Sequence, residues 1–125
     1  MLQECRVGTA LPASDLQRAT AFYKGLGLEG KEDPGGVTYE CADGTGFMVF
    51  QSSGKSDGSF TQIGIEVKDL AAEMEDLRSK GVTFLDYDFP GMKTENGVMV
   101  DPSGGQGAWF KDSEGNLIGL FQPQS

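Results

Sequence analysis

The chain has 125 residues, no histidine, and a net charge of −9 from 10 Lys+Arg against 19 Asp+Glu. A chain of this length forms one domain and buries a core without disulfide bonds. The negative charge argues against nucleic acid and anionic membrane surfaces as partners, and it is compatible with a cationic ligand. Because histidine is absent, Ser-His and Cys-His nucleophiles are excluded, and the commonest metal ligand of proteins is missing.

No stretch of the sequence reaches the ~18 apolar residues that would span a membrane. The chain does not open with the basic and apolar segments of a signal peptide. We therefore expect a cytoplasmic protein. In that reducing compartment the two cysteines, Cys5 and Cys41, are expected to be buried free thiols.

Two segments of the chain repeat each other with an offset of 54 residues, GTALPASDLQRATAFYKGLGL and QIGIEVKDLAAEMEDLRSKGV. Each opens like a strand, and an aspartate (Asp15 or Asp69) then stands where a helix N-cap belongs. Gly27 and Gly81 suit the left-handed position just past a helix end. Between cap and glycine, apolar residues recur at helical spacing: Leu16, Ala19, Phe22, Tyr23 and Leu26, and then Leu70, Met74 and Leu77. Each copy therefore predicts a strand followed by a helix.

Three strand-like segments follow each helix, near 29–33, 37–41 and 47–51 and near 82–86, 108–111 and 117–122. The last two of each half read as hairpins of equal length, GVTYECADGTGFMVFQ and GAWFKDSEGNLIGLFQ. Their closing phenylalanines, Phe50 and Phe121, lie 71 residues apart, so the second half carries 17 extra residues in the loop 86–106.

The sequence therefore predicts an α+β fold of two tandem βαβββ modules, residues 1–52 and 60–125, joined by a Gly- and Ser-rich linker, 53–59. One helix packs behind each small sheet, and the helix-free faces of the sheets curl around a cleft.

Three segments carry a resemblance to a known family: LPASDLQRATAFYKGLGL, IGIEVKDL and AWFKDSEGNLIGLFQ. In their order and pairing they resemble the vicinal oxygen chelate superfamily, also called the glyoxalase/bleomycin resistance/dioxygenase superfamily. The resemblance covers nearly the whole chain. It implies paired βαβββ modules, a ligand cleft, a homodimer, and usually a divalent metal held by up to four side chains.

The resemblance places those four metal positions at Gly8, Met48, Gln62 and Gly119. Glycine has no side-chain donor, and a thioether is a soft ligand suited to Cu(I). A single neutral amide cannot hold a hard divalent ion. We therefore expect no metal and no cofactor at the family site, and no oxygen-chelating reaction.

Strand parity from these positions indicates which side chains face the cleft. The ligand-binding candidates are Trp109, Gln62, Met48, Phe50, Phe60, Phe121, Lys111 and Arg6. Glu66 and Glu40 share that side and are candidate general bases, although Glu66 could instead pair with Arg6 or Lys111. An apolar, aromatic lining with a few charges is typical of a small-molecule pocket. Phe110, Tyr39, Phe47, Val49, Ile118 and Leu120 are expected to pack on the helix side.

Three functions fit these observations. The first is a metal-independent binding protein that holds a small molecule in an aromatic cleft. The second is a metal-independent lyase or isomerase that uses a cleft glutamate as base. The third is a structural or regulatory dimer whose cleft is vestigial. The sequence favours the first. It leaves open whether one chain or two form the cleft, and whether the loop 86–106 is a lid or a surface connection.

Overall fold

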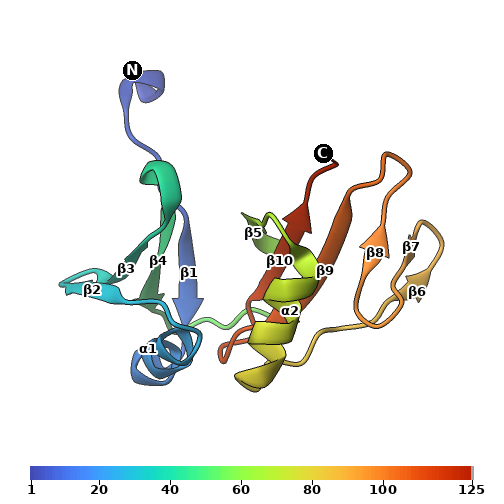
Figure 1. The fold of residues 1–125 in the computed structure, drawn as a ribbon. Helices are drawn as coiled ribbons and strands as arrows, with labels where there is room; N and C mark the ends of the chain where they lie inside the picture. The colour runs from blue at the N-terminus through green and yellow to red at the C-terminus, as the bar shows by residue number, and fades with distance from the viewer. Residues whose placement is uncertain (125) are drawn as a thin grey trace.

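The computed structural model describes residues 1–124, which form two modules of the same topology (Figure 1). Module one contains β1 (Ala10–Ala13), α1 (Leu16–Gly25), β2 (Gly30–Asp33), β3 (Gly36–Glu40) and β4 (Gly46–Gln51). Module two contains β5 (Thr61–Glu66), α2 (Leu70–Ser79), β8 (Met99–Val100), β9 (Gln106–Lys111) and β10 (Leu117–Gln122), with a small hairpin of β6 (Asp88–Phe89) and β7 (Met92–Lys93). The predicted α+β fold of two βαβββ modules is confirmed.

Each module has a four-stranded mixed sheet, in the order β1-β4-β3-β2 and β5-β10-β9-β8. The first strand of each module runs parallel to the last, so that Ala10 lies opposite Met48 and Ile63 opposite Ile118. The remaining neighbours in each sheet are antiparallel. The first strand of each module is therefore an edge strand.

The two helices begin and end as the repeat predicts. The carboxylates of Asp15 and Asp69 accept from the backbone N–H groups of Arg18 and Ala72, three residues on. Gly27 and Gly81 follow the helices in the left-handed region, with φ of 95° and 94°.

The glutamine that ends each hairpin supplies a second helix cap. The Oε1 atom of Gln51 accepts from the backbone N–H of Leu16 at 3.1 Å. The Oε1 atom of Gln122 accepts from the backbone N–H of Leu70 at 2.8 Å. The shared glutamine therefore ties the last strand of each module to the first turn of its own helix, where N–H groups lack partners within the helix.

The core lies on the helix side of the sheets. The six side chains expected there are all buried: Phe110, Tyr39, Phe47, Val49, Ile118 and Leu120. In module one, the rings of Tyr23, Tyr39 and Phe47 lie with centroids 5.1–5.4 Å apart. In module two, Phe84 and Phe110 pack edge to face at 5.7 Å.

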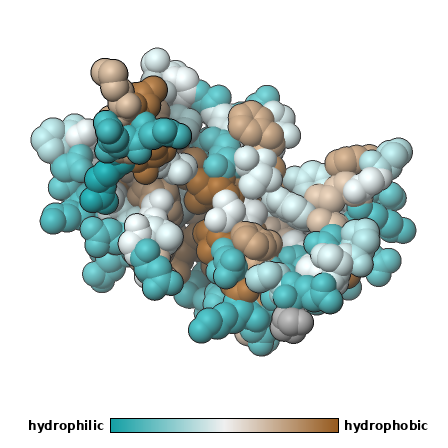
Figure 2. All heavy atoms as spheres, turned by 90° about the horizontal axis from the view of Figure 1, so that it is seen from above, coloured by the Kyte–Doolittle hydropathy of each residue, from teal (hydrophilic) through white to brown (hydrophobic). Residues whose placement is uncertain are grey.

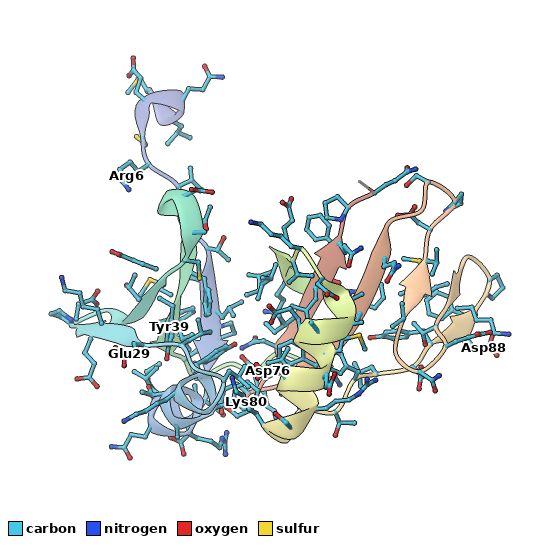
Figure 3. The ribbon with its side chains drawn as sticks, viewed as in Figure 1. Arg6, Glu29, Tyr39, Asp76, Lys80 and Asp88 are labelled. Carbon is cyan, nitrogen blue, oxygen red and sulfur yellow. The ribbon has the colours of Figure 1, made fainter. Side chains whose placement is uncertain are left out.

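The β9–β10 turn joins the two modules. The Asn116 Nδ2 atom donates to the carbonyl of Pro12, and the Tyr23 hydroxyl donates to Asp112 at 2.6 Å. The Glu114 carboxylate accepts from Arg18 at 2.7 and 3.0 Å, and also from the backbone N–H of Asp15 and the hydroxyl of Ser14. At the other end of the helices, Lys80 donates to the carbonyl of Leu26, close to where Figure 3 labels the Lys80–Asp76 pair.

Three expectations are wrong. Residues 82–86 form no strand, because Val82 and Phe84 pack into the core while the Asp86 carboxylate folds the chain by accepting from Thr94 and Gly97. Both cysteines are exposed, since Cys5 precedes β1 and Cys41 stands at the β3–β4 turn. The first strand begins at Ala10, so Arg6 and Gly8 lie outside the sheet. In the part of the chain that the structure describes, no helix is long and apolar enough to cross a membrane.

Candidate functional site

An aromatic surface occupies the helix-free side of module two. We call it the Trp109 face and define it as Thr61, Gly64, Gly107, Trp109, Gly119 and Phe121, contributed by β5, β9 and β10. The register sets Gly119 opposite both Trp109 and Gly64, and Phe121 opposite Gly107. Strand alternation then puts their side chains on the side away from Ile118 and Leu120, which are buried in the core.

The Trp109 indole is fixed on this face by two contacts. Its Nε1–H donates to the hydroxyl of Thr61 at 3.1 Å. The ring of Tyr87 meets it edge to face, with centroids 5.9 Å apart and planes at 87°, an arrangement that aromatic pairs favour. Trp109 is half-buried, so part of the ring stays open to solvent.

Two glycines make room for the indole. A Cβ atom at Gly119 would lie 3.1 Å from the Trp109 Nε1 atom and 3.2 Å from the Thr61 methyl carbon. A Cβ atom at Gly107 would lie 3.1 Å from the far edge of the six-membered ring. The indole therefore lies along the sheet over both glycines. A side chain at 119 would therefore require the indole or Thr61 to shift.

A β-bulge changes which residue of β5 lies beside Trp109. Leu117 is opposite Thr61, but the next residue, Ile118, is opposite Ile63, so Gln62 is the extra residue. The bulge brings Thr61 to the Trp109 face, where unbroken alternation predicted Gln62. The Gln62 Oε1 atom instead accepts from the backbone N–H of Leu117 and the hydroxyl of Ser56.

The other predicted ligand-binding residues are divided among three places. Phe60 and Phe121 are 66% and 44% exposed on module two, where Lys111 is also exposed on β9. Met48 and Phe50 are half-buried on β4, in the other sheet, opposite Ala10 and Pro12. Arg6 is exposed on the segment before β1, which Figure 3 shows extending away from both sheets.

The two candidate bases lie in solvent. Glu66 is opposite Phe121 at the end of β5, and Glu40 is opposite Gly46 at the end of β3. Both are exposed, so neither has the apolar surroundings expected around a general base in a cleft. Among residues 1–124, Glu66 forms no ion pair with Arg6 or Lys111.

The residues at the four metal positions do not fit a hard divalent ion. Gly8 lies before β1 with no atom within 4 Å of a Cβ position, and the space at Gly119 is taken by the indole. The amide oxygen of Gln62 already accepts two hydrogen bonds. Met48 offers only a thioether. Within residues 1–124, no group of three or more His, Cys, Asp or Glu side chains is placed to hold a metal.

Two adjacent hollows lie on the helix side of module one, between α1 and the β2–β3 hairpin. They measure about 390 and 540 Å³ and share Thr20, Lys24, Glu32 and Val37. None of the predicted ligand-binding residues lines them. From above, apolar atoms also gather between the two halves of the molecule, inside a polar rim (Figure 2).

Buried polar groups gather at the β9–β10 turn, which the sequence analysis did not single out as a structural centre. Hydrogen bonds from Arg18, together with the backbone N–H of Asp15, lower the pKa of Glu114 to about 2. Burial, reinforced by the nearby Asp112 carboxylate, raises the pKa of Tyr23. These groups hold the modules together and lie on the helix side, so we assign them to the fold rather than to ligand binding.

Residues 7–120 match the sequence model of the Glyoxalase/Bleomycin resistance protein/Dioxygenase superfamily. The chain belongs to this superfamily. A search of curated proteins finds no match. The resemblance recognised in the sequence is therefore confirmed at the level of the superfamily.

Solved structures with the same fold cover almost the whole chain. A bleomycin-binding protein complexed with bleomycin has 24% identity and a TM-score of 0.71, covering 96% of this chain and 99% of that one. TnmS3, an antibiotic binding protein from Streptomyces sp. CB03234, has 25% identity and a TM-score of 0.69, covering 96% and 97%. The fosfomycin resistance protein FosX from Listeria monocytogenes has 15% identity and a TM-score of 0.71, covering 96% and 93%. The similarity to the first and third shows the fold alone.

Proposed function

We propose that this protein binds a small molecule without a metal, and that the ligand lies against the Trp109 face. One observation carries the proposal. The Trp109 indole lies over Gly119, one of the four metal positions that the resemblance to the superfamily implies. Thr61 and Tyr87 hold that indole with part of its ring open. A rigid aromatic surface replaces a metal centre.

The similar structures support this class of function. Two of them are described as binding bleomycin or an antibiotic. Base and drug rings stack readily on indole, and a cationic ring gains further from the ring quadrupole. The net charge of −9 favours the approach of a cation. We therefore propose a planar aromatic ligand, with a cationic one favoured.

We also propose that the protein forms a homodimer. The Trp109 face and the face that carries Met48 and Phe50 belong to separate sheets. Phe60 and Phe121 leave large apolar side chains exposed on module two. A second copy that covers part of these faces would turn an open surface into a cleft.

The first test is a native mass spectrum of the protein as purified, with metal analysis of the same sample. The proposal predicts a dimer, with no stoichiometric metal and with or without a retained organic molecule. One tightly held metal ion per subunit would overturn the metal-independent reading. A strictly monomeric protein would remove the dimer from the proposal.

The second test locates the ligand. Calorimetric titration with metal-free bleomycin and a panel of planar aromatic antibiotics should yield a binder. Trp109→Ala should weaken that binder about 5- to 150-fold, since base–aromatic stacking contributes about 1–3 kcal/mol. Val100→Ala is the control, because Val100 is exposed on β8 and lies outside the Trp109 face. Equal affinity in all three proteins would place the ligand elsewhere.

A further inference from the structure

The orientation of Trp109 depends on Thr61, which reaches the Trp109 face because of the β-bulge in β5. The indole N–H donates to the Thr61 hydroxyl at 3.1 Å. Thr61 is opposite Leu117, on the same side of the sheet as Gly119. Had β5 continued in strict alternation from Ile63, Thr61 would lie on the helix side of the sheet with Ile63, which packs against the core.

The bulge that moves Thr61 is held by side-chain hydrogen bonds. The Gln62 oxygen accepts from the Leu117 N–H, which faces the extra residue across the irregular step. Unpaired backbone N–H groups at a bulge cost stability unless something satisfies them. The Gln62 side chain meets that requirement from within the bulge itself.

The linker between the modules holds Gln62 in turn. The Ser56 hydroxyl donates to the Gln62 oxygen, and it also accepts from the backbone N–H of Gly58 at 3.2 Å. The Ser56 carbonyl packs close to Gly115 in the β9–β10 turn, 2.7 Å from where a Cβ atom would lie. These contacts hold Ser56, a linker residue, against the β9–β10 turn.

From this chain of contacts we infer that Thr61 is a positioning residue for Trp109, and that the Ser56–Gln62 hydrogen bond keeps Thr61 in place. The role of Thr61 in ligand binding rests on the proposed function, whereas its role in orienting the indole does not. Because the indole N–H already donates to Thr61, a ligand would contact the ring and not the N–H group.

Trp109 is the only tryptophan in the chain, so a ¹⁵N-labelled sample gives a single indole N–H resonance. Thr61→Val keeps the side-chain shape and removes the acceptor. The indole proton should then move upfield and exchange with solvent about tenfold faster, the factor for a lost hydrogen bond of about 1.4 kcal/mol. Thr61→Ser keeps a hydroxyl and should restore both values to near those of the parent. An unchanged resonance and exchange rate in Thr61→Val would overturn the inference.

The linker step has its own test. Ser56→Ala should shift the same resonance in the same direction by a smaller amount, and the effects of Ser56→Ala and Thr61→Val should not add, because both act through one contact. Ser53→Ala, an exposed serine of the same linker, is the matched control and should leave the resonance unmoved. A Ser56→Ala spectrum equal to the parent would remove Ser56 from the inference.

Ligand titrations on the same variants separate this inference from the proposed function. If Thr61→Val moves the indole resonance while Trp109→Ala leaves the ligand affinity unchanged, Thr61 orients Trp109 but the ligand binds elsewhere, and the proposed function fails alone. If the resonance is unmoved while Trp109→Ala abolishes binding, the positioning inference fails alone.

Discussion

The β3–β4 turn and the β9–β10 turn have similar sequences, but the acidic residue of the first is exposed to solvent and that of the second is buried. Cys41 and Asp112 open turns whose backbone N–H donates to the carbonyl four residues on, at 2.8 and 2.9 Å. Asp43 and Glu114 are the acidic residues at the same position in these turns. Asp43 is exposed, with a left-handed φ of 57°. Glu114 is 1% exposed and bonded to module one.

The difference lies in the side chains at the corners of the turn, since the backbone pattern is shared. The later turn has Asp112 and Asn116 where the earlier one has Cys41 and Thr45. The Asp112 carboxylate accepts from the backbone N–H groups of Glu114 and Asn116, which closes the turn from inside. A turn braced in this way can be buried, because most of its polar groups find partners without water. The Asn116 Oδ1 atom is the exception and has no hydrogen-bond partner among residues 1–124.

The largest effect expected from this comparison is in Glu114→Ala. Removing the carboxylate takes the hydrogen-bond acceptor away from the Arg18 guanidinium and the Asp15 N–H. Because Arg18 is half exposed and water can reach it, the expected cost is about 2 kcal/mol, below that of a fully buried ion pair. Asp43→Asn, in the exposed turn, keeps a residue that tolerates the left-handed backbone and should cost less than about 0.5 kcal/mol. Urea unfolding of both variants measures the difference. Equal losses would mean that the two turns contribute alike to stability.

Acid should weaken the same contact without any mutation. Because folding lowers the pKa of Glu114 from 4.5 to about 2, its contribution is complete above pH 4.5 and is lost as the pH falls toward 2. Arg18 is 51% exposed, so screening by water reduces the expected loss to about 2 kcal/mol. Glu114→Gln should therefore differ most from the parent near pH 6 and least near pH 2.5 in the free energy of unfolding. A constant difference across that range would contradict the assigned pKa.

The smallest effect is expected where the modules are alike. Gln51→Ala and Gln122→Ala each remove the bond to a first-turn N–H, which should cost about 1 kcal/mol. Gln51→Ala also removes the bond that the Gln51 Nε2 atom donates to the Ser14 carbonyl at 2.8 Å, so its melting temperature should fall at least as far as that of Gln122→Ala. A larger fall in Gln122→Ala would contradict this account of the two caps.

The repeat made most of the fold predictable. Asp15, Asp69, Gly27 and Gly81 are local features whose meaning depends only on neighbouring residues, and the structure uses each as predicted. The helix-side residues of the closing hairpins followed from period-two alternation, because those strands are regular.

The rest depends on contacts that no local pattern reveals. Glu114 is paired with Arg18, 96 residues earlier, and nothing in the turn itself indicates that it is buried. The alternation along β5 predicted Gln62 on the cleft side, but an extra residue at the bulge transferred that place to Thr61. Residues 82–86 read as a strand, yet tertiary packing of Val82 and Phe84 decides their conformation.

The docking of the β9–β10 turn has a consequence for synthesis of the protein. The Ser14 hydroxyl and the Asp15 N–H donate to the Glu114 carboxylate, which is synthesised 100 and 99 residues after them. A ribosome adding about 5–20 residues per second needs roughly 5–20 seconds to deliver it. Once residue 51 has been added, module one has its own helix, sheet and glutamine cap, but the Ser14 hydroxyl and the Asp15 N–H still lack the Glu114 carboxylate. In the nascent chain, module one therefore exposes the surface at the start of α1 that the β9–β10 turn covers in the finished protein.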